Sequence, residues 1–296
     1  MTHAFKSALW LTFFSIILIS WVVLYQMSTG MGLDLIGRPT MDMGAMDMGT
    51  SEMGAMEMQA APMGGMPASD MAASDMPAME LPAADMPAMD MSAMTRFNPL
   101  FGMWTLMMAA MMLPTLVPTL TNYDRLITSA DGTRAGWLGV LAGYSIVWIA
   151  MAALFALTQI ALLRAGVIDM MGVASNTWIA GGLLILVGGF QFTRAKEVCH
   201  GVCHAPMTYF LGHWRTGFSG GLRMGLGLGT FCAGCCWGFM ALGFVGGMMS
   251  LLWMGLATLF MVFEKLPQIG HYVTKPLGAA LMIGGLGVLA YPYIAA

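Results

Sequence analysis

The chain has 296 residues and a formal net charge of −3; 58% of its residues are hydrophobic and only 9% are charged. This composition is typical of a membrane protein, because a bilayer span needs about 20 predominantly apolar residues. The sequence contains no nucleotide-binding domain, no phosphorylation loop and no basic–aromatic stripe. The absence of these motifs excludes an ATP-driven pump within this chain and a nucleic-acid partner. The apolar composition indicates the lipid bilayer as a partner.

The first apolar segment covers residues 8–25 and follows Lys6. The next residues are Gln26, Met27 and Ser28, which do not form the small-residue cleavage site of a signal peptide. We therefore predict that residues 1–26 form an uncleaved N-terminal transmembrane anchor.

Residues 27–96 form a methionine- and acid-rich segment. Positions 41–94 hold sixteen methionines and nine carboxylates in repeats such as MDMGAMDM, with no Cys, His, Lys, Arg or aromatic residue. Thioethers are soft ligands that select Cu(I), so Met41, Met43, Met46 and Met48 are candidate ligands. The segment is expected to be disordered, because it has no apolar periodicity. The alternative is a linker whose methionines are compositional drift or a sink for oxidants.

Six further apolar spans are expected in residues 97–296, which we predict to form a metal-binding membrane domain. They cover residues 97–120, 136–157, 178–192, 221–245, 248–263 and 277–293. The stretch 218–263 is nearly continuous and must be divided near Gly246 and Gly247. With the anchor, the sequence predicts an all-α, polytopic transmembrane bundle of about seven spans.

The orientation follows from Lys and Arg, which prefer the cytoplasmic side of a membrane. With the N-terminus inside, nine basic residues fall in cytoplasmic segments and three in outer segments. The nine are Lys6, Arg125, Arg134, Arg194, Lys196, Arg215, Arg223, Lys265 and Lys275, and the three are Arg38, Arg96 and Arg164. We expect a bacterial inner-membrane protein with its methionine-rich segment on the periplasmic side.

The second expected span carries a methionine stripe in the sequence MWTLMMAAMMLP. Its members are Met103, Met107 and Met111, four residues apart, with Met108 and Met112 beside them. Pro114 and Pro118 then interrupt the helix near its inner end. A thioether ladder of this kind suits a Cu(I) relay into the membrane, whereas the alternative is a kinked helix packed by flexible side chains.

A first thiol group, CHGVCH, follows the fourth expected span. If this segment is helical, Cys199 and Cys203 share one face, and His200 and His204 share the next. Two thiols with two imidazoles could hold zinc at Cys199 and Cys203. The motif also resembles a stretched haem-attachment sequence, although haem attachment occurs outside the cytoplasm.

A second thiol group, FCAGCCWGFM, lies in the fifth expected span near mid-membrane. Cys235 and Cys236 follow Cys232 by three and four residues, so the three thiols share a helix face. This face is a candidate Cu(I) site, and the alternative is packing, because cysteine is a small buried hydrophobe. Cys232 and Cys235 also form a CxxC pair, but no cation lies beside Cys232 in sequence to lower its pKa. Glu264 and Lys265 are interpreted as markers of the inner membrane boundary, with a snorkelling lysine; the alternative is that the Glu264 carboxylate lies near a metal exit.

Four segments together carry a family resemblance: MWTLMMAAMMLP, KEVCHGVCHAP, FCAGCCWGFMALGFVGGMMSLLWM and EKLPQIG. Over residues 98–291 the chain resembles a bacterial family of predicted metal-binding integral membrane proteins. The resemblance implies a helical membrane domain with a metal site at Cys199, Cys203, Cys232, Cys235 and Cys236. His200 and His204 depart from the family's usual pattern. Residues 1–96 look like an addition, so copper specificity is assigned to this chain's own residues.

The hypothesis from the sequence is a copper-handling membrane protein. It collects Cu(I) on the methionine-rich segment and holds or passes it through intramembrane Met and Cys ligands, for delivery to a membrane cuproenzyme, transport or tolerance. Two alternatives stay open at this point: a quinone-linked thiol–disulfide oxidoreductase, and an accessory subunit of a larger membrane complex.

Overall fold

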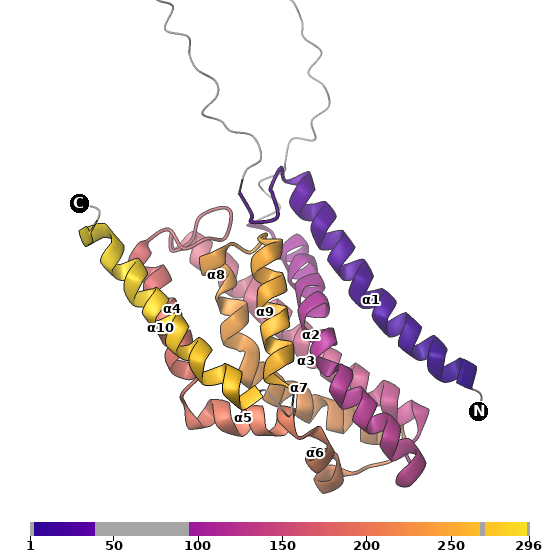
Figure 1. The fold of residues 1–296 in the computed structure, drawn as a ribbon. Coiled ribbons are helices and arrows are strands. Elements are labelled where there is room, and N and C mark those ends of the chain that lie inside the picture. The colour runs from indigo at the N-terminus through magenta and orange to yellow at the C-terminus, as the bar shows by residue number, and fades with distance from the viewer. Residues whose placement is uncertain (1–2, 39–94, 267–269, 295–296) are drawn as a thin grey trace, which may run out of the picture. The chain divides into compact units, whose positions relative to one another are not determined.

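The computed structural model describes residues 3–38, 95–266 and 270–294, and every regular element in these ranges is a helix (Figure 1). The helices are α1 (His3–Gly30), α2 (Phe97–Ser129), α3 (Arg134–Arg164), α4 (Thr177–Phe190), α5 (Arg194–His204), α6 (Pro206–His213), α7 (Gly217–Ala241), α8 (Gly243–Gly246), α9 (Leu251–Glu264) and α10 (Gly270–Ile294). The prediction of an all-α fold is confirmed. The candidate ligands Met41, Met43, Met46 and Met48 lie outside the described residues, and so does most of the segment that was predicted to be disordered.

Within the described residues, five helical segments are long and apolar enough to cross a membrane: Ala4–Gly30, Phe97–Ile127, Arg134–Arg164, Gly217–Gly246 and Tyr272–Tyr293. A sixth is counted only if α4 and residues Arg194–Cys203 of α5, which meet at a bend of 65°, are taken as one broken span. Helix α9 has 14 residues, about 21 Å of helix, and is too short to cross an apolar layer of about 30 Å alone. The expected count of seven spans is therefore not confirmed.

Helix α2 continues through both of its prolines and ends at Ser129, beyond the expected end at residue 120. Pro114 has no N–H to donate to the carbonyl of Ala110, four residues earlier. The indole Nε1 of Trp21 on α1 donates to that carbonyl at 3.1 Å. The side chain replaces the missing backbone donor, so the helix continues past the proline instead of ending there.

The N-terminal helix is tied to α2 at a second place by charge. The carboxylate of Asp124 on α2 accepts from Lys6 at 3.0 Å and from the indole of Trp10 at 3.2 Å, and it also pairs with Arg134. Helix α1 is thus hydrogen-bonded to α2 through both Trp10 and Trp21. It is therefore a packed part of the helical assembly.

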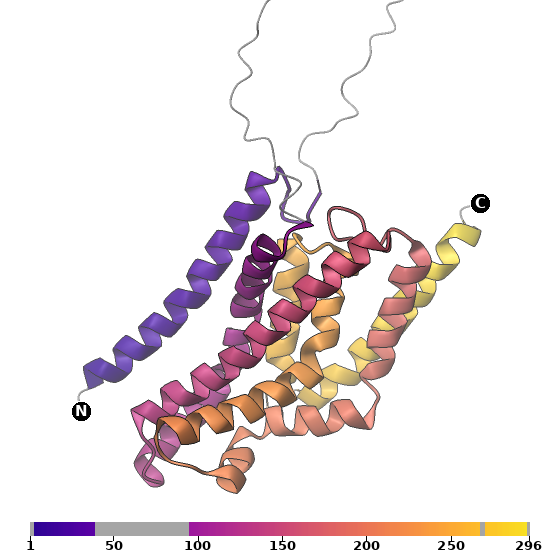
Figure 2. The same ribbon diagram turned by 180° about the vertical axis from the view of Figure 1, so that it is seen from behind.

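Helices α3 and α7 lie against one another along their lengths (Figure 2). Small residues at every fourth position of α7 make this approach possible. A Cβ on Gly221 would lie 2.0 Å from the carbonyl oxygen of Gly136, and one on Gly225 would lie 2.3 Å from that of Val140. These contacts fix the rotation of α7 about its axis, and the rotation determines which way the cysteines of its second half point.

Candidate metal centre

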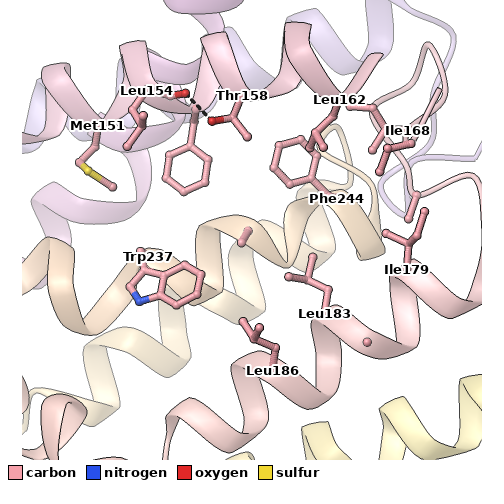
Figure 3. A pocket seen from close by; sticks show the side chains of 15 residues that line it. Met151, Leu154, Thr158, Leu162, Ile168, Ile179, Leu183, Leu186, Trp237 and Phe244 are labelled. Carbon is pink, nitrogen blue, oxygen red and sulfur yellow. Dashed lines mark hydrogen bonds between the residues drawn. The ribbon is translucent and has the colours of Figure 1, made fainter. Parts of the chain in front are cut away.

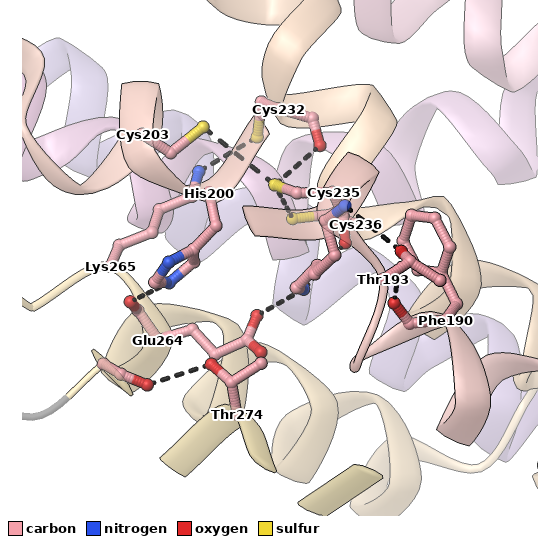
Figure 4. Close-up of polar contacts among 12 residues, drawn as sticks. Phe190, Thr193, His200, Cys203, Cys232, Cys235, Cys236, Glu264, Lys265 and Thr274 are labelled. Carbon is pink, nitrogen blue, oxygen red and sulfur yellow. Dashed lines mark hydrogen bonds and ion pairs between the residues drawn. The ribbon is translucent and has the colours of Figure 1, made fainter. Parts of the chain in front are cut away.

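Three buried sulfur atoms meet between α5 and α7 (Figure 4). The Sγ atoms of Cys203 on α5 and of Cys232 and Cys235 on α7 all lie within 4.8 Å of one another. All three side chains are buried, and all five cysteines of the chain are free thiols. Sulfur atoms this close, in a site shielded from solvent, can converge on one soft metal ion.

The bend between α4 and α5 brings Cys203 to α7. Thr193 caps α5 by accepting a hydrogen bond from the Lys196 backbone N–H at 3.3 Å. Across the contact, a Cβ at Gly234 would lie 3.0 Å from the Sγ of Cys199. A glycine at this position therefore lets α5 lie close enough for Cys203 to reach the two α7 thiols.

The other candidate ligands of the two thiol groups lie differently. The Sγ of Cys236 is 3.3 Å from that of Cys235 but falls outside the group of three. Cys199 is half-buried and also outside that group. The Nε2 of His200 lies 2.7 Å from the carbonyl oxygen of Glu264. The side chain of His204 is not among those described, and the described side chains do not assemble a zinc site of two thiols and two imidazoles.

Lys265 lies inside the protein, in contact with the thiol group. The residue is only 6% exposed. Its Nζ donates to the Sγ of Cys232 at 3.0 Å and to Oγ1 of Thr115 at 2.8 Å. The hydroxyl of Tyr144 lies 3.1 Å from the same sulfur. The interpretation of Lys265 as a snorkelling boundary residue is therefore wrong. No cation lies beside Cys232 in the sequence, but the ammonium of Lys265 lies beside it in the folded structure.

Glu264 and Lys196 form a buried ion pair on the other side of the thiols. Their side chains are 2% and 1% exposed, and Oε2 accepts from Nζ at 3.0 Å. The ammonium of Lys196 also donates to the backbone carbonyl of Cys235 at 2.9 Å. Glu264 is thus an interior residue, contrary to its interpretation as a boundary marker. Sequence reasoning missed Lys196 as well, although Lys196 precedes Cys203 by seven residues, two helical turns, and so shares its face.

The methionine stripe of α2 faces the interior. Its five members are buried: Met103, Met107, Met108, Met111 and Met112. The four-residue spacing from Met103 continues through Met111 to Thr115, whose hydroxyl contacts Lys265 and lies 3.2 Å from that of Tyr144. Met108 and Met112 line a cavity of about 230 Å³ together with Tyr144. The stripe therefore ends at the polar neighbours of Cys232.

A larger cavity of about 580 Å³ between α3, α4 and α7 is apolar (Figure 3). Leu183, Trp237 and Phe244 are among the side chains around it. Its polar lining residue Thr158 donates to the carbonyl of Leu154 at 2.8 Å and is thereby satisfied. The described residues that line this cavity supply no thiol, imidazole or carboxylate.

The chain matches a known protein family. The model of the PpoB2 family, described as a copper chaperone, matches residues 101–288. The matched region begins in α2 and ends in α10, so it includes all five cysteines and the methionine stripe, and it leaves out α1 and the methionine-rich segment. No curated protein and no solved structure matches the chain.

The buried ion pair gives a prediction for stability. Replacing Glu264 with Gln leaves the ammonium of Lys196 buried without its counter-charge, and we expect a loss of about 3–5 kcal/mol in the free energy of unfolding. Replacing both residues, as Lys196→Met with Glu264→Gln, removes both charges and should cost clearly less than the sum of the single changes Lys196→Met and Glu264→Gln. Denaturant unfolding of the detergent-purified protein measures all four forms. Additive losses would show that the two charges do not interact.

Proposed function

Because the chain belongs to the PpoB2 copper chaperone family, we propose that it accepts Cu(I) at the periplasmic face of a bacterial cytoplasmic membrane and carries it to thiols inside the helical domain. A copper-handling role follows from the family and from a thiol cluster suited to metal. The oxidation state, the membrane location, the ligands and the route are parts of the proposal.

The observation that carries the proposal is the convergence of Cys203, Cys232 and Cys235 within 4.8 Å. Thiolate sulfur is soft and suits Cu(I), which needs only two or three ligands. The ligands come from two helices, α5 and α7, so bound copper would hold the bent α5 against α7. Cys236 is the neighbouring thiol to which copper could move, since its Sγ lies 3.3 Å from that of Cys235.

The proposed route to this centre follows α2. Met103, Met107 and Met111 are spaced about 6 Å apart along the helix axis, at about 1.5 Å per residue. The next position in this series is Thr115, whose hydroxyl accepts a hydrogen bond from Lys265. The same ammonium also donates to the Sγ of Cys232. Neutral thioethers bind Cu(I) without losing a proton, so they can pass it along a buried path without leaving charge behind.

The methionine-rich segment is proposed as the collector. Its thioethers bind soft metal, and its nine carboxylates raise the local concentration of cations. The membrane location is supported by five helices of sufficient length and apolarity and by the uneven placement of Lys and Arg. The proposed recipient is a membrane cuproenzyme or its complex, which would take copper from a carrier that itself catalyses no reaction.

The first test removes the thiols. Replacing Cys203 and Cys232 with Ser should reduce tight Cu(I) retention at least about 100-fold, because serine oxygen is a hard ligand and only one sulfur of the group remains. The matched control is Cys199→Ser, which alters a half-buried thiol outside the group and should leave retention within about twofold of the parent. Metal analysis and competition with a Cu(I) chelator under reducing conditions measure both. Equal retention in the double variant and the parent would refute the proposed centre.

The second test removes the collector. Deletion of residues 41–94 should weaken copper loading when external copper is scarce, since the thioether collector is then absent. The defect should shrink as copper is raised enough to load the thiols directly. Copper content of the purified protein after growth over a range of copper concentrations measures this. A deletion that changes loading at no concentration would identify the segment as a linker.

A second candidate function is favoured by one contact. The ammonium of Lys265 lies 3.0 Å from the Sγ of Cys232, which is the kind of cation that activates a redox thiol. A thiol–disulfide oxidoreductase must cycle its cysteines through a disulfide, whereas a Cu(I) site needs reduced sulfur. Thiol trapping in intact cells should find Cys203, Cys232 and Cys235 reduced or metal-protected. Disulfide that increases with respiratory activity would instead support the enzyme.

A further inference from the structure

Three charged side chains are buried around the thiols in the described part of the chain, and they do not cancel. Lys196 and Glu264 neutralise each other at 3.0 Å. Lys265 is left with a positive charge and, among the described residues, has no ion pair with a carboxylate. These three side chains therefore give the centre a net charge of +1 when its thiols are protonated.

The surroundings of Lys265 suit an ammonium that faces sulfur. Nζ donates to Oγ1 of Thr115 and to the Sγ of Cys232, and it lies 5.9 Å from the centre of the Tyr144 ring. A buried charge is costly unless an opposite charge compensates it. Of the two groups that accept a hydrogen bond from this ammonium, Thr115 and Cys232, the Cys232 thiol is the one that becomes anionic when it binds metal as a thiolate.

We propose that Lys265 is the fixed counter-cation of the copper–thiolate complex and sets the number of thiolates that bind the ion. The inference rests on the proposed copper function. One Cu(I) with two thiolates carries a single negative charge, which Lys265 neutralises. A third thiolate would leave an uncompensated negative charge in the protein interior, so the third cysteine of the group stays a thiol.

The alternative is that Lys265 acts only as a hydrogen-bonding link between α2 and α7. Two variants separate the alternatives. Lys265→Met removes the charge while nearly keeping the volume, and Thr115→Val removes the hydroxyl partner while keeping the charge. If charge matters, the first variant weakens copper binding far more than the second. If the hydrogen-bonded link matters, the two variants behave alike.

The experiment measures Cu(I) affinity of full-length, detergent-purified protein by competition with a chromophoric Cu(I) chelator under reducing conditions. Lys265→Met should bind about 100-fold more weakly than the parent, from the attraction of unit charges a few ångströms apart. Thr115→Val should lose less than about 10-fold. Lys265→Arg keeps the charge and should restore most of the affinity that the methionine variant loses. Thermal unfolding of each metal-free variant shows whether the fold is kept.

X-ray absorption at the copper edge of the loaded parent protein gives a second, independent readout. Two sulfur ligands are expected. Three sulfur ligands would overturn the inference even if every Lys265 variant failed to fold, and so would a well-folded Lys265→Met variant with the parent's affinity. A parent protein that binds no Cu(I) would instead overturn the proposed function itself, so the two failures are distinguishable.

Discussion

The arrangement of the helices depends on the partners of three charged side chains that are buried in the interior: Lys196, Glu264 and Lys265. Each charge must meet a partner, because an unpaired buried charge costs several kcal/mol. The pair between Lys196 and Glu264 joins α5 to the end of α9, and the contacts of Lys265 join α9 to α2 and α7. Four helices are therefore held in one register around the thiols, more specifically than apolar packing alone could hold them.

Helix α7 packs against α3 with its first half and carries thiols of the metal centre in its second half. Its first half presents Gly221 and Gly225 to α3, and its second half presents Cys232 and Cys235 to α5. The glycines permit a backbone contact that larger residues would prevent, and this contact sets the rotation of the helix. Bulk added at the glycine contact would therefore move the thiols, although the two sites are separate along the helix.

Local spacing was enough to predict part of this arrangement. The apolar runs predicted seven of the described helices but not α5, α6 and α8, and the interval between Cys232 and Cys235 placed both thiols on one face. The spacing could not show that Cys203, rather than Cys236, completes the group, because that depends on the 65° bend before α5. Lys265 is 33 residues from Cys232, and no periodicity links positions so far apart. In the sequence, Glu264 and Lys265 at the end of an apolar run look like a membrane boundary. Only the folded structure shows the buried groups that they contact.

The match to the copper chaperone family bears on where copper specificity is assigned in the chain. From the sequence we assign it to this chain's own residues, because residues 1–96 look like an addition; the family match covers residues 101–288 and leaves out the methionine-rich segment. The domain with the thiols and the α2 stripe is therefore the part shared with copper chaperones. In the proposed route, affinity increases inward, because anionic thiolates attract Cu(I) more strongly than neutral thioethers do. A counter-cation at Lys265 allows this increase without a net buried charge, so copper can be held at the thiols and still leave when a partner offers thiolates of its own.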